Sequence, residues 1–139
     1  MFKINLINSF VYLLIKYIIF FLILAFTGDR FKHIVIDNAE TSSEMFKLTL
    51  GYIVYILIFT IPMILVFGFP LYYILKIKKG WNFIMCIIIF YCVEYFAYTF
   101  LNSQKYFYDW NGIYNALIGI ILFGILFHKT IRLKFTNPK

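Results

Sequence analysis

Residues 10–26 have the sequence FVYLLIKYIIFFLILAF, in which Lys16 is the one charged side chain. A helix needs about 20 mostly apolar residues to cross the hydrocarbon core of a bilayer. Similar apolar runs follow at residues 48–67, 81–101 and 112–128. The pattern predicts an all-α fold, namely a polytopic integral membrane protein in which four transmembrane helices form a single domain over residues 1–139.

The composition supports a membrane protein. Of the 139 residues, 63% are apolar and 14% are charged, whereas about 25% are charged in an ordinary soluble domain. So few polar residues cannot cover the core of a soluble domain of this size. The composition therefore excludes a soluble globular enzyme, and the bilayer is the first expected partner.

The basic residues predict the topology. If the N-terminus is cytoplasmic, eight basic and no acidic residues lie inside, and four basic and five acidic residues lie outside. The positive-inside rule then favours two cytoplasmic termini in a bacterial inner membrane. Six of these residues form a predicted cytoplasmic rim: Lys76, Lys78, Lys79, Lys129, Arg132 and Lys134. The net charge of +7 is therefore explained by basic residues in the cytoplasmic loops and termini rather than by a nucleic-acid site. No direct binding of nucleic acid is expected.

Two features of these runs leave alternatives open. The first run has a basic start and a weak small-residue site near Ala25, so the alternative is a cleaved signal peptide, which would leave three helices. The second run continues uncharged to Leu75 and contains Pro62 and the break Gly68-Phe69-Pro70. It predicts either a span over 48–67 followed by a cytoplasmic interfacial helix over 70–79, or one long tilted helix. Before this run, Thr41-Ser42-Ser43-Glu44 fits a capping box.

Glu94 lies inside the third run, where an ionisable group is costly and is expected to face the bundle interior with a partner. Depth along the helices gives four candidate partners, which are Lys16, Tyr55, Tyr98 and Asn115. Two interpretations remain open. Either Glu94 joins the helices by hydrogen bonding, or it is a proton or ion site or the contact for a partner's transmembrane helix.

Motifs for catalysis are absent from the sequence. It has no HExxH, no Walker loop, no GxSxG and no zinc-spaced Cys/His set, so we expect no enzyme activity, cofactor or metal. On the fourth run, Gly112, Ala116 and Gly119 form a smooth stripe. Such a stripe favours a close helix contact, either within the unit or between two copies as a homo-oligomer seam.

These observations predict a small non-enzymatic inner-membrane protein that acts by binding a protein partner. We expect a role in bacterial conflict. It would be either immunity to a membrane-inserted, pore-forming toxin or the membrane subunit of an antiphage defence system that docks a cytoplasmic subunit. The alternative is a transport or channel accessory subunit in which Glu94 lines a path between copies.

Overall fold

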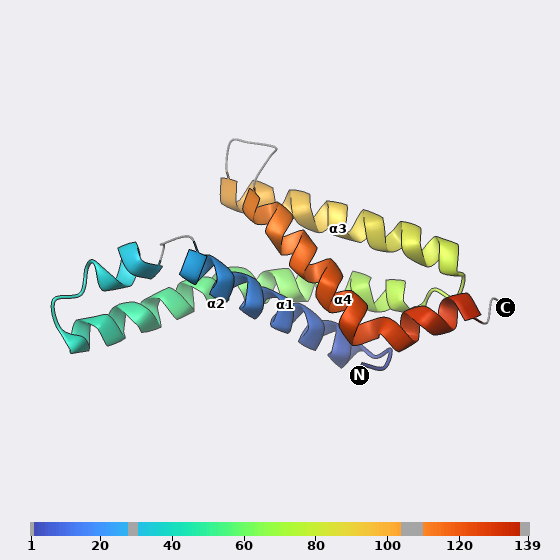
Figure 1. Ribbon diagram of the computed structural model, residues 1–139, viewed down its shortest axis with the longest axis horizontal. Coiled ribbons are helices and arrows are strands. Elements are labelled where there is room, and N and C mark those ends of the chain that lie inside the picture. The colour runs from blue at the N-terminus through green and yellow to red at the C-terminus, as the bar shows by residue number, and fades with distance from the viewer. Residues whose placement is uncertain (1, 28–30, 104–109, 137–139) are drawn as a thin grey trace.

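The computed structural model describes residues 2–27, 31–103 and 110–136. All regular secondary structure in that part of the chain is helical (Figure 1). The elements in chain order are α1 (Leu6–Thr27), a short π-helix η1 (Lys32–Ile36), α2 (Ser42–Lys76), α3 (Gly80–Ser103) and α4 (Trp110–Thr136). The four α-helices are long and apolar enough to cross a membrane. This confirms the all-α prediction, and each predicted run lies within one of these helices.

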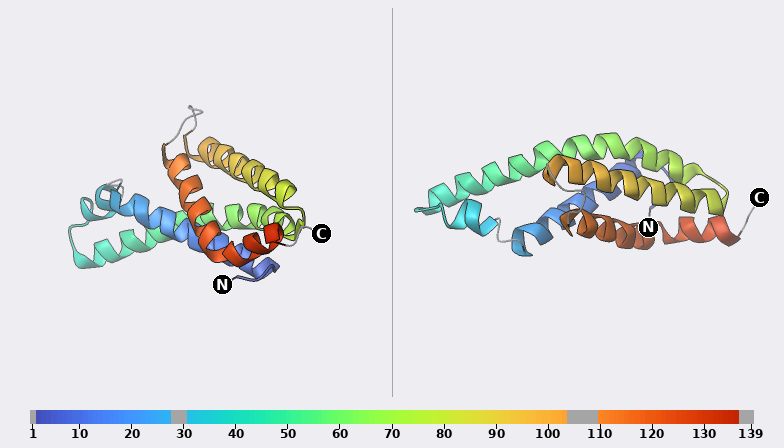
Figure 2. Two further views of the ribbon diagram at one scale, coloured as in Figure 1. Left: turned by 45° about the vertical axis from the view of Figure 1, so that its right-hand side comes forward. Right: turned by 90° about the horizontal axis from the view of Figure 1, so that it is seen from above.

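Helix α2 is continuous over 35 residues, although it contains Pro62 and Pro70. At 1.5 Å per residue it extends about 52 Å, well beyond the hydrocarbon thickness. The prediction of a separate interfacial helix over 70–79 is therefore wrong. The chain instead forms one long helix that continues to Lys76. The missing proline hydrogen bonds are offset by packing, because Phe67, Gly68 and Leu71 are buried. The helix is visibly arched (Figure 2).

The capping box at the start of α2 is confirmed. Thr41 is extended and its hydroxyl accepts a hydrogen bond from the Glu44 backbone N–H at 3.2 Å. The Glu44 carboxylate accepts in return from the Thr41 N–H, also at 3.2 Å. Two of the unpaired donors at the helix start are thereby satisfied, and α2 begins six residues before the predicted span.

The helices form a bundle in which α1 packs against α2 and α4, and α3 packs against the same two helices. Helices α1 and α3 therefore lie diagonally opposite each other. The core between them is mostly aromatic. Its larger buried side chains are Tyr12, Tyr17, Phe20, Phe67, Phe83, Phe90, Tyr91, Tyr98, Phe123 and Phe127.

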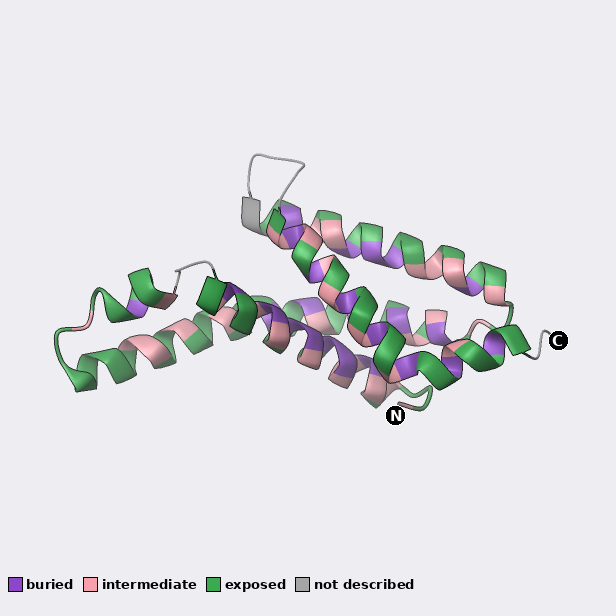
Figure 3. Ribbon diagram, in the orientation of Figure 1, coloured by how far each residue is buried: buried purple, intermediate pink, exposed green. Residues whose placement is uncertain are grey.

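The bundle has two ends, which we name by the chain. The proximal end carries the N-terminus, the turn between α2 and α3, and the end of α4, whereas the distal end carries the turn between α1 and α2 and the start of α4 (Figure 1). The distal half of α2, residues 42–59, extends away from α3 and α4 together with η1 (Figures 1 and 3). No side chain in residues 42–59, all of which are described, is buried.

The predicted small-residue stripe on α4 is an internal contact. A methyl group on Gly112 would lie 2.9 Å from Thr99 Oγ1 and from the Tyr95 ring of α3. A methyl group on Gly119 would lie 2.7 Å from Lys16 Cε and 2.8 Å from the Tyr91 ring. Glycine at these positions lets α4 approach α1 and α3 closely.

Candidate functional site

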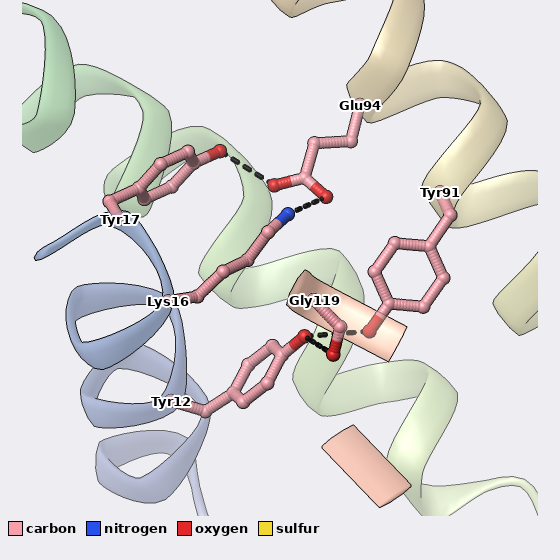
Figure 4. Close-up of polar contacts among 6 residues, drawn as sticks. All are labelled: Tyr12, Lys16, Tyr17, Tyr91, Glu94 and Gly119. Carbon is pink, nitrogen blue, oxygen red and sulfur yellow. Dashed lines mark hydrogen bonds and ion pairs between the residues drawn. The ribbon is translucent and has the colours of Figure 1, made fainter. Parts of the chain in front are cut away.

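The centre of the bundle contains an ion pair between Lys16 of α1 and Glu94 of α3 (Figure 4). The side chains are 0% and 1% exposed, respectively. Lys16 Nζ donates to Glu94 Oε2, and the Tyr17 hydroxyl donates to Oε1 at 2.6 Å. Both carboxylate oxygens thus accept hydrogen bonds from α1, which is what a buried charge requires to remain ionised.

A second polar layer lies one helical turn closer to the proximal end. The Tyr12 hydroxyl donates to the Gly119 carbonyl at 2.8 Å, and it lies 2.6 Å from the Tyr91 hydroxyl (Figure 4). Because the one Tyr12 proton points to the carbonyl, Tyr91 is the donor to Tyr12. This layer connects α1, α3 and α4 through two hydrogen bonds.

Helical spacing explains why the two layers stack. Tyr12 and Lys16 are four residues apart on α1, and Tyr91 and Glu94 are three apart on α3, so each pair shares a helix face. Since α1 and α3 are diagonal, long side chains are needed to span the distance between them. Gly119 provides the room, because it leaves open the space that Lys16 Cε and the Tyr91 ring occupy.

The structure pairs Glu94 with the predicted partner Lys16. Tyr98 is buried nearby with its ring edge-on to Phe20 at 5.3 Å. Asn115 is 1% exposed and lies one turn distal of Gly119. Its Oδ1 has no hydrogen-bond partner in the described part of the chain.

The prediction of Tyr55 as a partner of Glu94 is wrong. Its side chain is 53% exposed and packs on Phe59 of its own helix. Residue counting along the helices predicted that Tyr55 is as deep as Glu94. Tyr55 instead lies in the distal half of α2, which extends away from α3 and α4.

The predicted basic rim is also wrong at one position. Five of its six residues are exposed, but Lys134 is 8% exposed and donates hydrogen bonds to the carbonyls of Leu75, at 2.9 Å, and Ile77. Its ammonium also lies 4.7 Å from the centre of the Phe83 ring. Lys134 therefore caps the C-terminal end of α2, where unpaired carbonyls and the helix dipole favour a cation.

Sequence reasoning missed the three tyrosines that complete the polar layers: Tyr12, Tyr17 and Tyr91. The spacing of Tyr12 to Lys16 and of Tyr91 to Glu94 was a usable signal, because it places a hydroxyl beside each charge.

The polar groups around the ion pair are hydrogen-bonded to one another. The ammonium and the carboxylate neutralise each other, and the neighbouring hydroxyls point at the carboxylate or at a carbonyl. Within residues 2–27, 31–103 and 110–136, no three His, Cys, Asp or Glu side chains are grouped to hold a metal ion. His33 pairs with Asp37 at 2.9 Å on the exposed η1, and His128 lies exposed on α4.

An apolar cleft of about 480 Å³ lies between the second half of α1 and the distal half of α2. Phe31, before η1, closes one side of it and packs edge-on against Tyr52 of α2 at 5.6 Å. Unlike the ion pair, this cleft is open to the surroundings of the bundle. Comparison with known protein families, curated proteins and solved structures finds no match to the chain.

Proposed function

We propose that this chain is a non-enzymatic, multi-pass protein of a bacterial inner membrane and that it acts by binding a partner inside the bilayer. The four apolar helices support membrane insertion. The excess of basic residues at the proximal end supports two cytoplasmic termini under the positive-inside rule. In this topology the distal end faces outward.

The observation that carries this proposal is the distal half of α2. Residues 42–59 contain no buried side chain, whereas six residues of α2 from Thr60 onward are buried. Transmembrane helices associate through close packing of their side chains and backbones. A half-helix that extends from the bundle beside an apolar cleft has the surface that a second membrane-inserted helix would need.

Gly51 is the glycine of this half-helix and supports the same interpretation. No atom of the described chain beyond its immediate helical neighbours lies within 4 Å of the position where a methyl group would be added. Gly51 therefore makes no close contact with another helix of the described bundle. In a helix interior, glycine lowers helix stability by about 1 kcal/mol relative to alanine. Such a glycine in a membrane helix permits close approach of another helix backbone.

A pore-forming toxin that enters the membrane from outside would meet the distal end first. Of the two proposed roles in bacterial conflict, we therefore favour immunity to such a toxin over the membrane subunit of an antiphage system. The exposed lysines Lys76, Lys78, Lys79 and Lys129, with Arg132, are the feature that favours a cytoplasmic acidic partner instead. The transport alternative needs Glu94 to face a path between copies, and its pairing within one chain argues against that role.

Site-specific photo-crosslinking in cells that naturally encode the protein tests this proposal. A photoreactive residue at Ile58, on the distal half of α2, is expected to give one discrete protein adduct. The same residue at Val66, exposed on the proximal half, is the control and is expected to give none. Gly51→Leu should abolish the Ile58 adduct, whereas Gly124→Leu, at an equally open glycine of α4, should leave it.

Two results would contradict the proposal. One is equal adducts from Ile58 and Val66. The other is an Ile58 adduct that survives Gly51→Leu. The identity of the Ile58 adduct then distinguishes the two forms of bacterial conflict. A secreted pore-former supports immunity, and a membrane-anchored protein with a cytoplasmic domain supports the defence subunit.

A further inference from the structure

The buried polar atoms of the bundle are unevenly satisfied. Three of them have no hydrogen-bond partner in the described part of the chain: Thr60 Oγ1 of α2, Thr99 Oγ1 of α3 and Asn115 Oδ1 of α4. Their side chains are 3%, 4% and 1% exposed, respectively. Three different helices thus each place one unpaired oxygen in the interior.

All three oxygens lie on the distal side of the ion pair. Thr99 is five residues beyond Glu94 on α3, which is about 7 Å along the helix axis. Asn115 is one turn distal of Gly119, which lies against Lys16. Thr60 begins the buried part of α2 and lines a space next to Tyr17 and Tyr98.

On the proximal side the corresponding groups are paired. The Ser9 hydroxyl donates to the Asn5 carbonyl at 3.2 Å, the Tyr12 and Tyr91 hydroxyls bond each other, and Lys134 caps α2. Phe123 and Phe127 pack around Tyr12, which fills this half of the interior with rings. The ion pair thus separates a half in which these groups are paired from an incompletely paired half, which holds the three unpaired oxygens.

The incompletely paired half contains a small cavity. Its volume of about 10 Å³ is that of a single water-sized probe, and Tyr17, Thr60 and Tyr98 line it with four apolar residues. A space of this size is just large enough for one water molecule. Its surface is mostly apolar, and its polar groups come from Tyr17, Thr60 and Tyr98. The Tyr17 hydroxyl is bonded to Glu94, so the cavity adjoins the ion pair through one side chain.

We infer that the distal half of the bundle is a binding site for ordered water, with one molecule in the cavity beside Tyr17 and Thr60. An unpaired buried hydroxyl or amide oxygen is destabilising, and native proteins often satisfy such groups with ordered water. Water at this site completes the hydrogen bonding of Thr60 and lies next to Tyr17, whose hydroxyl donates to Glu94. The tyrosine layer closes the proximal side, so hydration reaches the ion pair from one end of the bundle. This inference does not depend on the proposed function.

Radiolytic hydroxyl-radical footprinting of the wild-type protein in lipid nanodiscs tests the inference, because bound water is activated in place and labels the side chains beside it. Two pairs of tyrosines with similarly low exposure provide the comparison: Tyr17 and Tyr98 on the distal side, Tyr12 and Tyr91 on the proximal side. We expect the distal pair to be labelled several-fold faster. Equal labelling of the two pairs would overturn the inference.

A pair of threonine variants provides a second test, in which a hydrated and a dry site shift the melting temperature in opposite directions. If water binds Thr60, Thr60→Val removes hydrogen bonds and lowers the melting temperature. If the site is dry, the same change removes an unsatisfied group and raises the melting temperature. Thr49→Val is the matched control on α2, because its hydroxyl is satisfied by the Met45 carbonyl at 2.7 Å. A Thr60→Val protein more stable than the Thr49→Val protein would overturn the inference.

Discussion

Lys16 and Glu94 form an ion pair between α1 and α3, two helices that are diagonal in the bundle and are separated by α2 and α4. The pair and the Tyr17–Glu94 and Tyr12–Tyr91 bonds are polar contacts that connect these helices in the described part of the chain. In an apolar core, such contacts fix which helix faces which, because a shifted or rotated helix would leave a buried charge unpaired. The geometry therefore favours a structural role for Glu94.

The first prediction concerns topology. Reporter fusions after Lys79 and at the C-terminus should both report the cytoplasm, because the positive-inside rule places segments flanked by basic residues on that side. A fusion at Asn38, between η1 and α2, should report the outside. A C-terminal reporter found outside would contradict the four-helix topology.

The second prediction compares two glycines of α4. Gly119→Ala should lower the free energy of unfolding by about 1–3 kcal/mol, because the added methyl group would meet Lys16 Cε and the Tyr91 ring. Gly124→Ala should be neutral or stabilise by up to about 1 kcal/mol, since nothing lies within 4 Å of its methyl position. Unfolding of both variants in bicelles measures the difference, and equal effects would contradict the close packing of α4.

The third prediction concerns the cap at the proximal end. Lys134→Met keeps most of the side-chain length but removes the donor to the Leu75 and Ile77 carbonyls. We expect a loss of about 2 kcal/mol, typical of hydrogen bonds from a charged group. Arg132→Gln, at an exposed position of the same turn, is the control and should change stability little. Indistinguishable melting curves for the two variants would show that Lys134 does not cap α2.

The fourth prediction concerns the start of α2. Thr41→Ala removes the hydroxyl that accepts from the Glu44 N–H and should cost about 1 kcal/mol of local helix stability. Hydrogen exchange should accelerate at the first backbone amides of α2 and remain unchanged beyond Thr60. Unaltered exchange at Glu44 would mean that the capping box contributes nothing.

Much of the fold was predictable from the sequence because apolar run length is a strong signal in membrane proteins. The Thr41–Glu44 capping box was also predictable, since it depends on neighbouring residues alone. Depth along the runs was sufficient to select Lys16 as a candidate partner of Glu94. It was not sufficient to exclude Tyr55, because depth does not tell which half of α2 remains in the bundle.

The remaining differences depend on tertiary packing. Two prolines favoured a break in α2, but burial of Phe67 and Leu71 against the bundle keeps it helical. Lys134 had the sequence features of an exposed rim lysine, and its burial depends on where α2 ends relative to α4. Both the packing around the α2 prolines and the contact of Lys134 with the end of α2 join segments that are distant in the chain. Local sequence composition does not predict such contacts.

A double-mutant cycle on Lys16 and Glu94 tests the central claim most directly. The free energy of unfolding is measured in bicelles for Lys16→Met, Glu94→Gln and the double variant. Each single change leaves a buried charge without its counter-ion and should cost about 3–5 kcal/mol. The double variant is neutral and should recover about 2–3 kcal/mol relative to the sum of the single changes. Strictly additive effects would contradict the account, because they would mean that the Lys16–Glu94 pair does not hold α1 and α3 together.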